Sequence, residues 1–488
     1  MTINESLVRG VVEEVLKQIT NRADGAAVGC PGNAYHSSCN SARGHNGIFT
    51  DANDAVAASV AAYDELSHRT IAERKKIVGI IRRVAIDQSV ELGTMEMNET
   101  KIGRLVHKID KLQNLGHNAP GVEFLKSEVF SGDYGLTVIE FAPFGVIGAV
   151  TPVTHSLPTI LNNAINMISS GNTLVVNPHP SGKRVAAEGV RRCNELILRE
   201  HGIDNLVSVI AEPTLQTADV IFKHPNVSLL VVTGGPAVAK AALSQQKRAI
   251  VAGPGNPPVV VDETADFDNA ARSIIAGAAY DNNLLCIAEK EVFVVESVFE
   301  VMMKAMERAG AVRLNAQQVD QFTQKAIVPT GEGASRHLVP SREFLGKDAA
   351  VLANGIGLSI PQNVELLYGE TDESNPFVPV EQMMPFVPFV RVKDIDHGID
   401  LAKKYEHGFR HTAIIHSSNV RNMTKMGKAL ETTIFVKNGA CTAGLGGGGE
   451  GYPSFSIAGP TGEGITTPLT FTRQRRCVLV DSLHVLGK

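Results

Sequence analysis

A single cysteine stands in the stretch DNNLLCIAEK, residues 281–290, between apolar neighbours and just ahead of an acid–base pair. Cys286 has two plausible uses. It could fill a core as a small hydrophobic residue, which is the usual place of a free cysteine, or its thiolate could be the nucleophile of an enzyme. For a lone cysteine in an apolar run the core interpretation is favoured, and only the rest of the chain can reverse it.

Two glycine-rich stretches follow patterns that bind nucleotides elsewhere. In VVTGGPAV, residues 233–235 follow an apolar strand, where glycine lets backbone N–H groups meet a phosphate at the start of a helix. In GLGGGGEG, residues 444–451, the spacing is formally G-x-G-x-x-G, but YPSFS follows in place of a helix start. We therefore predict a cofactor turn at 233–235 and a flexible loop lining a site or tunnel at 444–451.

No metal site is predicted. The chain has neither a CxxC pair nor an HExxH motif. His407 and His411 stand four residues apart, but Gly408 between them weakens a helix and no third ligand accompanies them. We assign both histidines to surface or packing roles.

The bulk composition is that of an ordinary globular protein. The chain has 488 residues, which predict two or three domains, with 43% hydrophobic and 20% charged residues. Its net charge of −5 gives no reason to expect nucleic acid or an anionic membrane as a partner, and no uninterrupted apolar run has the length of a membrane span. Six cysteines at irregular spacing, with no signal peptide ahead of them, predict free thiols in a reducing cytoplasm.

From residue 48 the pattern predicts an α/β protein. Residues 52–66 and 69–100 have helical periodicity. Apolar, β-branched runs then alternate with helical stretches, which indicates parallel sheets covered on both faces. We predict two doubly wound α/β lobes, joined near residues 253–262.

The first 47 residues differ from the rest. Residues 1–20 have apolar side chains at helical spacing and predict an amphipathic helix, and residues 21–47 predict a flexible linker. A short tethered helix cannot bury its apolar stripe alone. It must fold back on its own domain or dock in a partner, and the residues leave both alternatives open.

Two further segments predict exposed strands. Residues 127–143 have the pattern of a hairpin, and residues 469–487 that of a terminal strand. Exposed strands must be paired or covered. Pairing between subunits is the simplest solution, so we expect a homo-oligomer, a dimer or a tetramer.

The chain resembles the aldehyde dehydrogenase superfamily in seven stretches, which are, in order, TPVTHSLPTILNNAINMISSGNTLVVNPHPSGKR, VTGGPAVA, GPGNPPVVVDETADF, YDNNLLCIAEKEVFVV, EQMMPFVP, TIFVKNG and PTGEGIT. It resembles more closely the CoA-acylating branch, the propionaldehyde and acetaldehyde dehydrogenases of bacterial microcompartments. The similarity covers residues 47–488. The N-terminal helix and linker resemble the encapsulation peptides of such enzymes.

This resemblance implies the aldehyde dehydrogenase fold, with two Rossmann-like lobes and a strand-based oligomerisation arm. The implied domains are a targeting helix (1–20), a linker (21–47), an NAD/CoA-binding domain (48–252) that carries the oligomerisation hairpin (127–143), a catalytic domain (253–458) and a C-terminal oligomerisation segment (459–488).

Under the resemblance Cys286 is the nucleophile, which reverses the initial preference. Its thiolate adds to an aldehyde carbonyl, and the resulting oxyanion needs hydrogen-bond donors. The Cys286 backbone N–H is one candidate, and Thr154, which stands where hydrolytic relatives have asparagine, is another. The adjoining His155 and Ser156 depart from the Asn–Pro of this branch. Collapse of the oxyanion sends hydride to NAD⁺ and leaves an acyl thioester on Cys286.

The second half-reaction is inferred from a missing carboxylate. Hydrolytic relatives carry a glutamate 34 positions before the cysteine, and here that position is Ala252. Without this base, CoA rather than water is expected to take the acyl group, in a reversible reaction. Glu263 and Glu289 are the nearest alternatives, and we assign both to structural roles.

The resemblance also implies a cofactor site for NAD and for CoA as co-substrate. Asn177 stands where many relatives have lysine, which leaves the choice between NAD and NADP open. The implied cofactor-binding residues are Thr151, Pro152, Thr154, Pro178, His179, Thr233, Gly234, Gly235 and Glu381.

The sequence therefore predicts a CoA-acylating, NAD-dependent aldehyde dehydrogenase for a short aliphatic aldehyde, with propanal preferred and acetaldehyde as the alternative. A hydrolytic dehydrogenase releasing free acid is a rival within enzymes, and a shell-associated scaffold is the rival outside them. The expected location is the cytoplasm, inside a bacterial microcompartment, with shell proteins bound through residues 1–20. Neither nucleic acid nor membrane is an expected partner.

Overall fold

The computed structural model describes residues 46–331 and 336–484. The predicted targeting helix, residues 1–20, and nearly all of the predicted linker lie outside the described residues. Within the described ranges, no helix is long and apolar enough to cross a bilayer.

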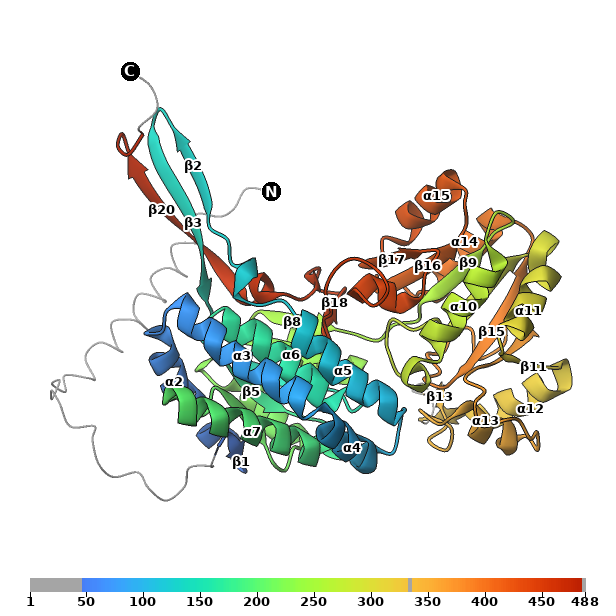
Figure 1. The fold of residues 1–488 in the computed structure, drawn as a ribbon, viewed down its shortest axis with the longest axis horizontal. Coiled ribbons are helices and arrows are strands. Elements are labelled where there is room, and N and C mark those ends of the chain that lie inside the picture. Colours follow the sequence, from blue (N-terminus) through green and yellow to red (C-terminus); the bar gives the residue numbers. More distant parts are fainter. Residues whose placement is uncertain (1–45, 332–335, 485–488) are drawn as a thin grey trace, which may run out of the picture. The chain divides into compact units, whose positions relative to one another are not determined.

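The first lobe is built on a six-stranded, all-parallel sheet in the order β1-β6-β5-β4-β7-β8 (Figure 1). The order reverses direction at β4, so the carboxyl ends of β5, β4 and β7 lie next to one another. Its strands are β1 (Ile48–Phe49), β4 (Val146–Val150), β5 (Thr173–Asn177), β6 (Val207–Ile210), β7 (Val227–Thr233) and β8 (Ala249–Ala252).

Helices cover both faces of this sheet, as its unbroken apolar strands require. Alternate residues of β4 face opposite sides: Ile147 belongs to one core, whereas Val146 belongs to the other. The first core contains α3 (Ile71–Asp87), α6 (Ser156–Ser169) and α7 (Lys183–His201). The second contains α2 (Ala52–Ser67), α8 (Leu215–Lys223) and α9 (Pro236–Leu243).

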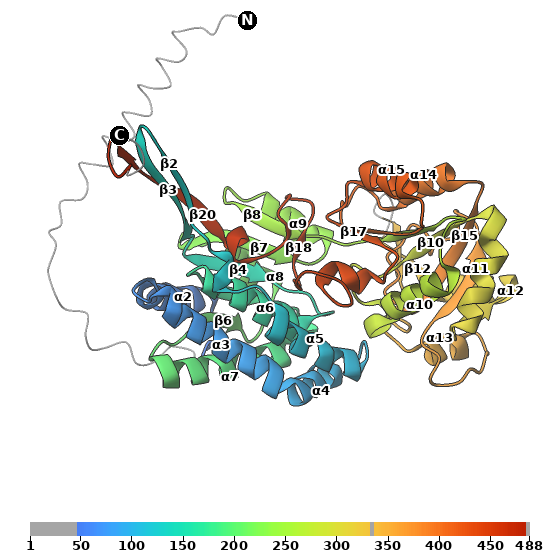
Figure 2. The ribbon, with the colours of Figure 1, turned by 45° about the horizontal axis from the view of Figure 1, so that its top comes forward.

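The second lobe repeats this plan with a seven-stranded parallel sheet in the order β11-β14-β15-β10-β9-β16-β17. Its strands are β9 (Pro258–Val261), β10 (Glu291–Val295), β11 (Val312–Leu314), β14 (Leu367–Thr371), β15 (Phe386–Val392), β16 (Thr412–His416) and β17 (Ile434–Lys437). Figure 2 shows α14 (Ile395–Tyr405) and α15 (Val420–Leu430) on one side of β10, and α10 (Phe267–Ala278) and α11 (Phe299–Arg308) on the other. The predicted fold class is confirmed.

Local signals explain where the helices begin and end. Thr70 caps α3 through a reciprocal capping box, in which its hydroxyl accepts from the Glu73 N–H and its own N–H donates to the Glu73 carboxylate. The predicted helical stretch 69–100 is two helices, α3 and α4 (Ser89–Thr100), because the backbone leaves the helical conformation at Gln88, with φ −110° and ψ 14°.

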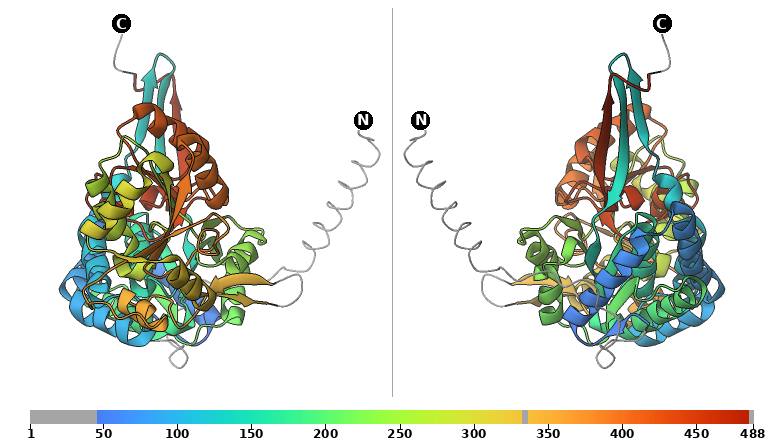
Figure 3. Two further views of the ribbon diagram at one scale, coloured as in Figure 1. Left: turned by 90° about the vertical axis from the view of Figure 1, so that its right-hand side faces the viewer. Right: turned by 90° about the vertical axis from the view of Figure 1, so that its left-hand side faces the viewer.

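The predicted hairpin is present as β2 (Glu128–Gly132) and β3 (Gly135–Pro143), and the chain end, β20 (Thr472–Val480), pairs with β3 to form a three-stranded antiparallel arm (Figure 3). The terminal strand is shorter than the predicted 469–487, because Pro468–Phe471 forms a 3₁₀ turn and the strand ends at Val480. The side chains of Val129, Phe130 and Val480 are about 60% exposed on this arm, an apolar surface that single chains rarely leave uncovered.

Candidate active site

Cys286 lies in an irregular segment between a 3₁₀ turn, η3 (Tyr280–Asn283), and the start of β10. Just ahead of it, Asp281, Asn282 and Asn283 adopt left-handed backbone conformations, with φ of 49°, 56° and 66°. Asp and Asn tolerate this region better than other side chains. The DNN triplet therefore forms a tight turn just ahead of Cys286, and the chain enters the interior strand β10 five residues after the cysteine.

The Cys286 side chain is half-buried. Burial and the charge of Glu381 raise the pKa of the Cys286 thiol and Lys290 and Lys111 lower it, with a net pKa of about 12. A thiol is a weak nucleophile, so attack on a carbonyl requires stabilisation of the thiolate by the surrounding charges.

Gly255 lies next to both Glu381 and the backbone of Cys286. Glu381 lies in the loop ahead of β15; burial raises the pKa of its carboxyl, whereas Lys290 and the Gly255 N–H lower it. A Cβ at Gly255 would lie 2.2 Å from the Cys286 carbonyl oxygen and 3.2 Å from Cγ of His411. Only glycine fits here, and its close approach joins the loop of the predicted ribose-binding acid to the loop of the predicted nucleophile.

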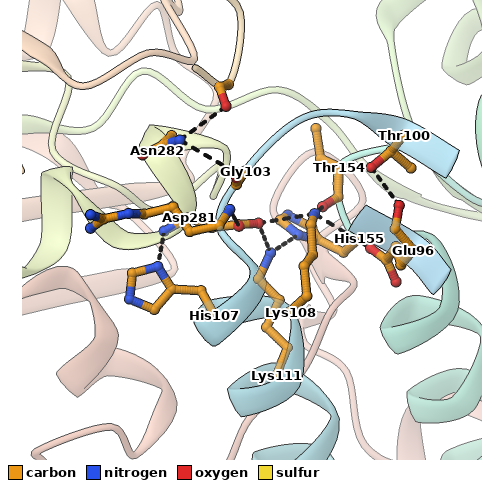
Figure 4. A network of polar contacts seen from close by, with 12 residues as sticks. Glu96, Thr100, Gly103, His107, Lys108, Lys111, Thr154, His155, Asp281 and Asn282 are labelled. Atoms are coloured by element: carbon orange, nitrogen blue, oxygen red, sulfur yellow. Dashed lines mark hydrogen bonds and ion pairs between the residues drawn. The ribbon is translucent and has the colours of Figure 1, made fainter. Parts of the chain in front are cut away.

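A buried charge network surrounds Asp281, in the turn ahead of Cys286 (Figure 4). Its centre is the carboxylate of Asp281, which is fully buried. Oδ2 of Asp281 lies 3.1 Å from Nζ of Lys108 and is bonded to Nζ of Lys111, while Oδ1 accepts from the Arg104 N–H at 2.8 Å. Nζ of Lys108 also lies 3.4 Å from the carboxylate of Glu96. Both lysines project from one face of α5 (Leu105–Asn118), because they are three residues apart.

The same two lysines hold the loop that carries Thr154. Nζ of Lys108 donates to the Thr154 carbonyl at 3.0 Å, and Nζ of Lys111 lies 2.8 Å from Nδ1 of His155. Burial lowers the pKa of Lys111 to about 8 and lowers the pKa of His155 well below its usual value, so His155 is neutral. The network thus ties the predicted oxyanion residue Thr154 to the turn ahead of Cys286.

A cavity of about 390 Å³ opens beside the cysteine. Leu285 and Ile287, the two neighbours of Cys286, line it, and so do Leu445 and Gly447 of the glycine-rich loop. The other lining residues are His107, Asp110, Lys111, Asn114, Ala276, Ala279, Tyr280, Glu365, Thr442, Pro453 and Phe455. Its volume is several times that of a small aldehyde.

The predicted cofactor residues of the first lobe gather at one edge of its sheet. Thr151 and Pro152 follow β4, Pro178 and His179 follow β5, and Gly234 and Gly235 follow Thr233, the last residue of β7, so all lie at the carboxyl ends of adjacent parallel strands. This edge, where the strand order reverses, is where open α/β sheets bind ligands.

This edge offers both a free polar group and open space. The buried hydroxyl of Thr151 has no hydrogen-bond partner within the described ranges. A Cβ added at Gly234 or Gly235 would meet no atom within 4 Å. A dinucleotide fits these observations. Asn177, which stands where many relatives have lysine, is buried, and its Oδ1 accepts a hydrogen bond from the Thr217 hydroxyl at 2.6 Å. It therefore holds the neighbouring turn and brings no positive charge to this edge.

Two residues considered in the sequence analysis, Thr233 and Glu289, are hydrogen-bonded to other groups of the chain. The hydroxyl of Thr233 is bonded to the Ser456 hydroxyl at 2.7 Å, so it is engaged within the chain. Glu289 is fully buried and accepts the Cys441 N–H at 2.8 Å, and burial raises its pKa to about 7. Glu263 is exposed. Ala252 ends β8 as a buried methyl side chain.

Sequence reasoning missed the charged groups that surround Cys286. Lys108, Lys111 and Asp281 form the network described above, and Lys290 is a further buried cation. The only sequence signals are two lysines three apart on an amphipathic helix and a lysine four residues after the cysteine. His411, assigned to packing, is buried against Gly255, and burial lowers its pKa to about 4.

The chain is similar to known proteins along most of its length. A family model described as "Aldehyde dehydrogenase family" matches residues 38–452. The chain is 44% identical over 444 residues to the acetaldehyde dehydrogenase (acetylating) EutE of Escherichia coli K12, covering 90% of this chain and 94% of EutE. It is 38% identical over 441 residues to the propanal dehydrogenase (CoA-propanoylating) of Citrobacter freundii, covering 90% and 94%.

Solved structures give the same result. The propionaldehyde dehydrogenase of Rhodopseudomonas palustris with bound propionyl-CoA matches with a TM-score of 0.87 and 42% identity, covering 90% of this chain and 97% of that chain. A second structure of that enzyme holds CoA and an acylated cysteine. A propionaldehyde dehydrogenase from the fucose utilisation microcompartment of Clostridium phytofermentans matches with a TM-score of 0.87 and 40% identity, covering 90% and 100%.

Proposed function

The chain belongs to the aldehyde dehydrogenase family, and we propose that it oxidises a short aliphatic aldehyde with NAD⁺ and CoA to an acyl-CoA and NADH. The observation that carries this proposal is the half-buried Cys286, whose two neighbours line a cavity large enough for the aldehyde. Relatives named as CoA-acylating dehydrogenases, and a neighbour structure with an acylated cysteine, support the same chemistry.

In the first half-reaction the Cys286 thiolate attacks the carbonyl carbon, and the electrons of the C=O π bond move to oxygen. The Cys286 backbone N–H and Thr154 are the proposed donors to that oxygen. Lys108 holds the Thr154 carbonyl, which fixes the loop without using the Thr154 hydroxyl. NAD⁺, when bound, accepts the hydride that leaves the former carbonyl carbon, and the C=O bond reforms as a thioester on Cys286.

In the second half-reaction a CoA thiol takes the acyl group, because the site lacks a base for water. Ala252 offers a methyl group where hydrolytic relatives have a carboxylate, Glu289 is engaged with Cys441, and Glu263 is exposed. A thiol near neutral pH is already a better nucleophile than unactivated water. One thioester replaces another, so the reaction is reversible.

The proposed NAD and CoA site is the edge of the first sheet, with Glu381 on the ribose side. Thr151 supplies an unused hydroxyl, and Gly234 and Gly235 leave room for a phosphate next to backbone N–H groups. The remaining proposed members are Pro152, Thr154, Pro178, His179 and Thr233.

Propanal is the proposed substrate, and acetaldehyde is the second candidate. The two solved neighbours described above are propionaldehyde dehydrogenases, one with propionyl-CoA bound, which favours propanal. The higher identity to EutE, 44% against 38% for the Citrobacter enzyme, favours acetaldehyde.

The proposed location is a bacterial microcompartment, with residues 1–20 binding shell proteins and the β2-β3-β20 arm pairing subunits. The Clostridium relative comes from such a compartment, and the exposed apolar side chains of the arm need a cover. Deleting residues 1–20 should leave turnover intact and abolish co-purification with shells. Normal packaging of the truncated enzyme would refute the targeting role.

NADH formation from propanal and from acetaldehyde, each with and without CoA, tests the proposed reaction. We expect CoA to be required and acyl-CoA to appear. Equal NADH formation without CoA, with free acid as product, would instead establish the hydrolytic rival. NADH formation by the wild type that is no faster than that of an inactive Cys286→Ala variant would revive the scaffold interpretation.

A further inference from the structure

Lys290 is a buried cation without a carboxylate partner. Its side chain is 0% exposed, and Nζ donates to the Asn283 carbonyl at 2.9 Å and to Asn283 Oδ1 at 2.6 Å. Among the residues that the structure describes, no carboxylate oxygen lies within 4.0 Å of this Nζ. Lys108 and Lys111, which are equally buried, each have such a partner. A buried charge without its counter-ion is costly and calls for an explanation.

The chain holds Lys290 rigidly in this position. Its N–H donates to the Pro257 carbonyl at 3.1 Å, and its carbonyl accepts from Nε2 of Gln382 at 2.8 Å. The amide of Asn283, which receives the ammonium group, is itself fixed by the carbonyls of Ala278 and Glu289 at 2.9 and 3.0 Å. The ammonium group is therefore preorganised, four residues after Cys286 in the chain.

The charges that act on Lys290 are those of carboxyl and thiol groups, among them Cys286 and Glu381 of the proposed active site. Burial lowers the pKa of Lys290, and the charges of Glu381, Cys286, Cys441 and Glu291 act in the opposite direction. In return, Lys290 lowers the pKa of Cys286, Glu381 and Cys441, of the carboxyls of Glu289 and Glu291, and of the rings of His155 and His411.

Cys286 is the member of this set that the proposed reaction turns into an anion. Glu381 opposes that ionisation, and Lys111, the other cation that favours it, is bonded to the Asp281 carboxylate. The charge of Glu381 acts most strongly on Lys290, but no carboxylate of the described chain forms an ion pair with it, so its ammonium group can also stabilise an anion that forms at Cys286.

We infer that Lys290 is the positioning residue that stabilises the Cys286 thiolate: a preorganised ammonium group, held by Asn283 and left without a bonded counter-ion until the nucleophile ionises. The inference rests on the proposed role of Cys286, yet its test does not require turnover.

Alkylation of Cys286 by iodoacetamide in the full-length enzyme without substrates measures the thiolate directly, because only the thiolate reacts. Peptide-resolved mass spectrometry reports the rate at Cys286 and at Cys477, an exposed thiol that serves as the internal reference. The variants are Lys290→Met, Lys290→Gln, which keeps a donor for Asn283, and Lys290→Arg, which keeps the charge. Arg74→Met is the matched control, since Arg74 is a partly buried cation bonded to the Ser169 carbonyl in the first lobe.

At pH 8 we expect the Cys286 rate to fall about tenfold or more in Lys290→Met and Lys290→Gln, which corresponds to about one pH unit in the thiol pKa. The rate should stay within about threefold of wild type in Lys290→Arg and Arg74→Met, and the Cys477 rate should not change. If Lys290→Met fails to fold, the alkylation rate of Cys286 in Lys290→Gln tests the inference. A Cys286 rate within twofold of wild type in a folded neutral variant would overturn the inference.

Parallel NADH assays separate this inference from the proposed function. If the neutral Lys290 variants show both slower alkylation of Cys286 and slower NADH formation than wild type, the inference and the proposed function are both supported. Slow alkylation in an enzyme that forms no NADH from any aldehyde supports Lys290 and contradicts the proposed reaction.

Discussion

Replacing Asp281 by asparagine removes the charge at the centre of the buried network and little else. Asparagine has nearly the same size, keeps an oxygen for the Arg104 N–H at 2.8 Å, and tolerates the left-handed φ of 49°. Two ammonium groups, Lys108 and Lys111, then remain in the interior with the Glu96 carboxyl as their only nearby acid in the described chain, and burial raises the pKa of Glu96.

The expected loss of stability at pH 7 is about 3–5 kcal/mol, the range for breaking a buried ion pair by removing one partner. The loss of stability has an upper limit, because Lys111 can release its proton and so remove one of the two buried charges. From an ordinary lysine pKa of about 10.4, that release costs about 5 kcal/mol at pH 7.

The sign of the pH dependence follows. In the variant the folded-state pKa of Lys111 lies further below its unfolded value, so the unfolded chain binds more protons between these two values. Stability therefore rises with pH in that window. Because the pKa of Lys111 in the folded wild type is about 8, the deficit relative to wild type should shrink between pH 7 and about pH 8, by up to about 1.4 kcal/mol for each pH unit, and change little above that.

Equilibrium urea unfolding followed by far-ultraviolet circular dichroism measures this loss, since the chain has no tryptophan for fluorescence. Asp219→Asn is the control, because Asp219 is about half exposed and pairs with Lys223 one helical turn away at 2.8 Å. We expect the control to lose no more than about 0.5 kcal/mol. A loss below about 1 kcal/mol in Asp281→Asn at pH 7, or a deficit that does not change with pH, would refute the reasoning.

Three further substitutions test single contacts. Gly255→Ala places a Cβ 2.2 Å from the Cys286 carbonyl oxygen and should lower kcat for NADH formation about a hundredfold, whereas Gly253→Ala, with its nearest neighbour at 3.5 Å, should not; equal kcat values would contradict the clash. Because the pKa of Glu289 rises on folding from about 4.5 to about 7, its protonated carboxyl stabilises the fold fully below about pH 4.5, and this contribution is lost as the pH rises through about 7. Glu289→Gln should therefore flatten the curve of Tm against pH between these two pH values. An unchanged slope would exclude the raised pKa of Glu289. Thr151→Val should raise KM for NAD⁺ about fivefold without lowering the Tm of the free enzyme, and an unchanged KM would remove Thr151 from the cofactor site.

The fold could be read from local patterns because each pattern has a local cause. The unbroken apolar runs of β4, β5 and β10 are buried on both faces, which is why they predicted parallel strands between helices. The predictions were wrong at the ends of individual helices and strands. The terminal strand is shorter than predicted because a 3₁₀ turn occupies Pro468–Phe471, and the 69–100 stretch divides at Gln88.

The candidate site was only partly predictable. Cys286, Glu381 and the turns after β4, β5 and β7 came from motifs, and the sheet order brings these turns to one edge. The assigned roles of these residues stay predictions until they are tested.

The sequence by itself predicted the two α/β lobes, the strands of the arm and Cys286 as the candidate nucleophile, because helix and strand periodicity and short motifs depend on neighbours a few residues apart. Only the tertiary structure decided the charge environment of that nucleophile. Lys111 and Asp281 are 170 residues apart in the chain and in contact in the fold, and Lys290 differs from Lys111 only in what folding places beside it. Electrostatic energy depends on distance and burial in space, and neither can be read from the order of residues.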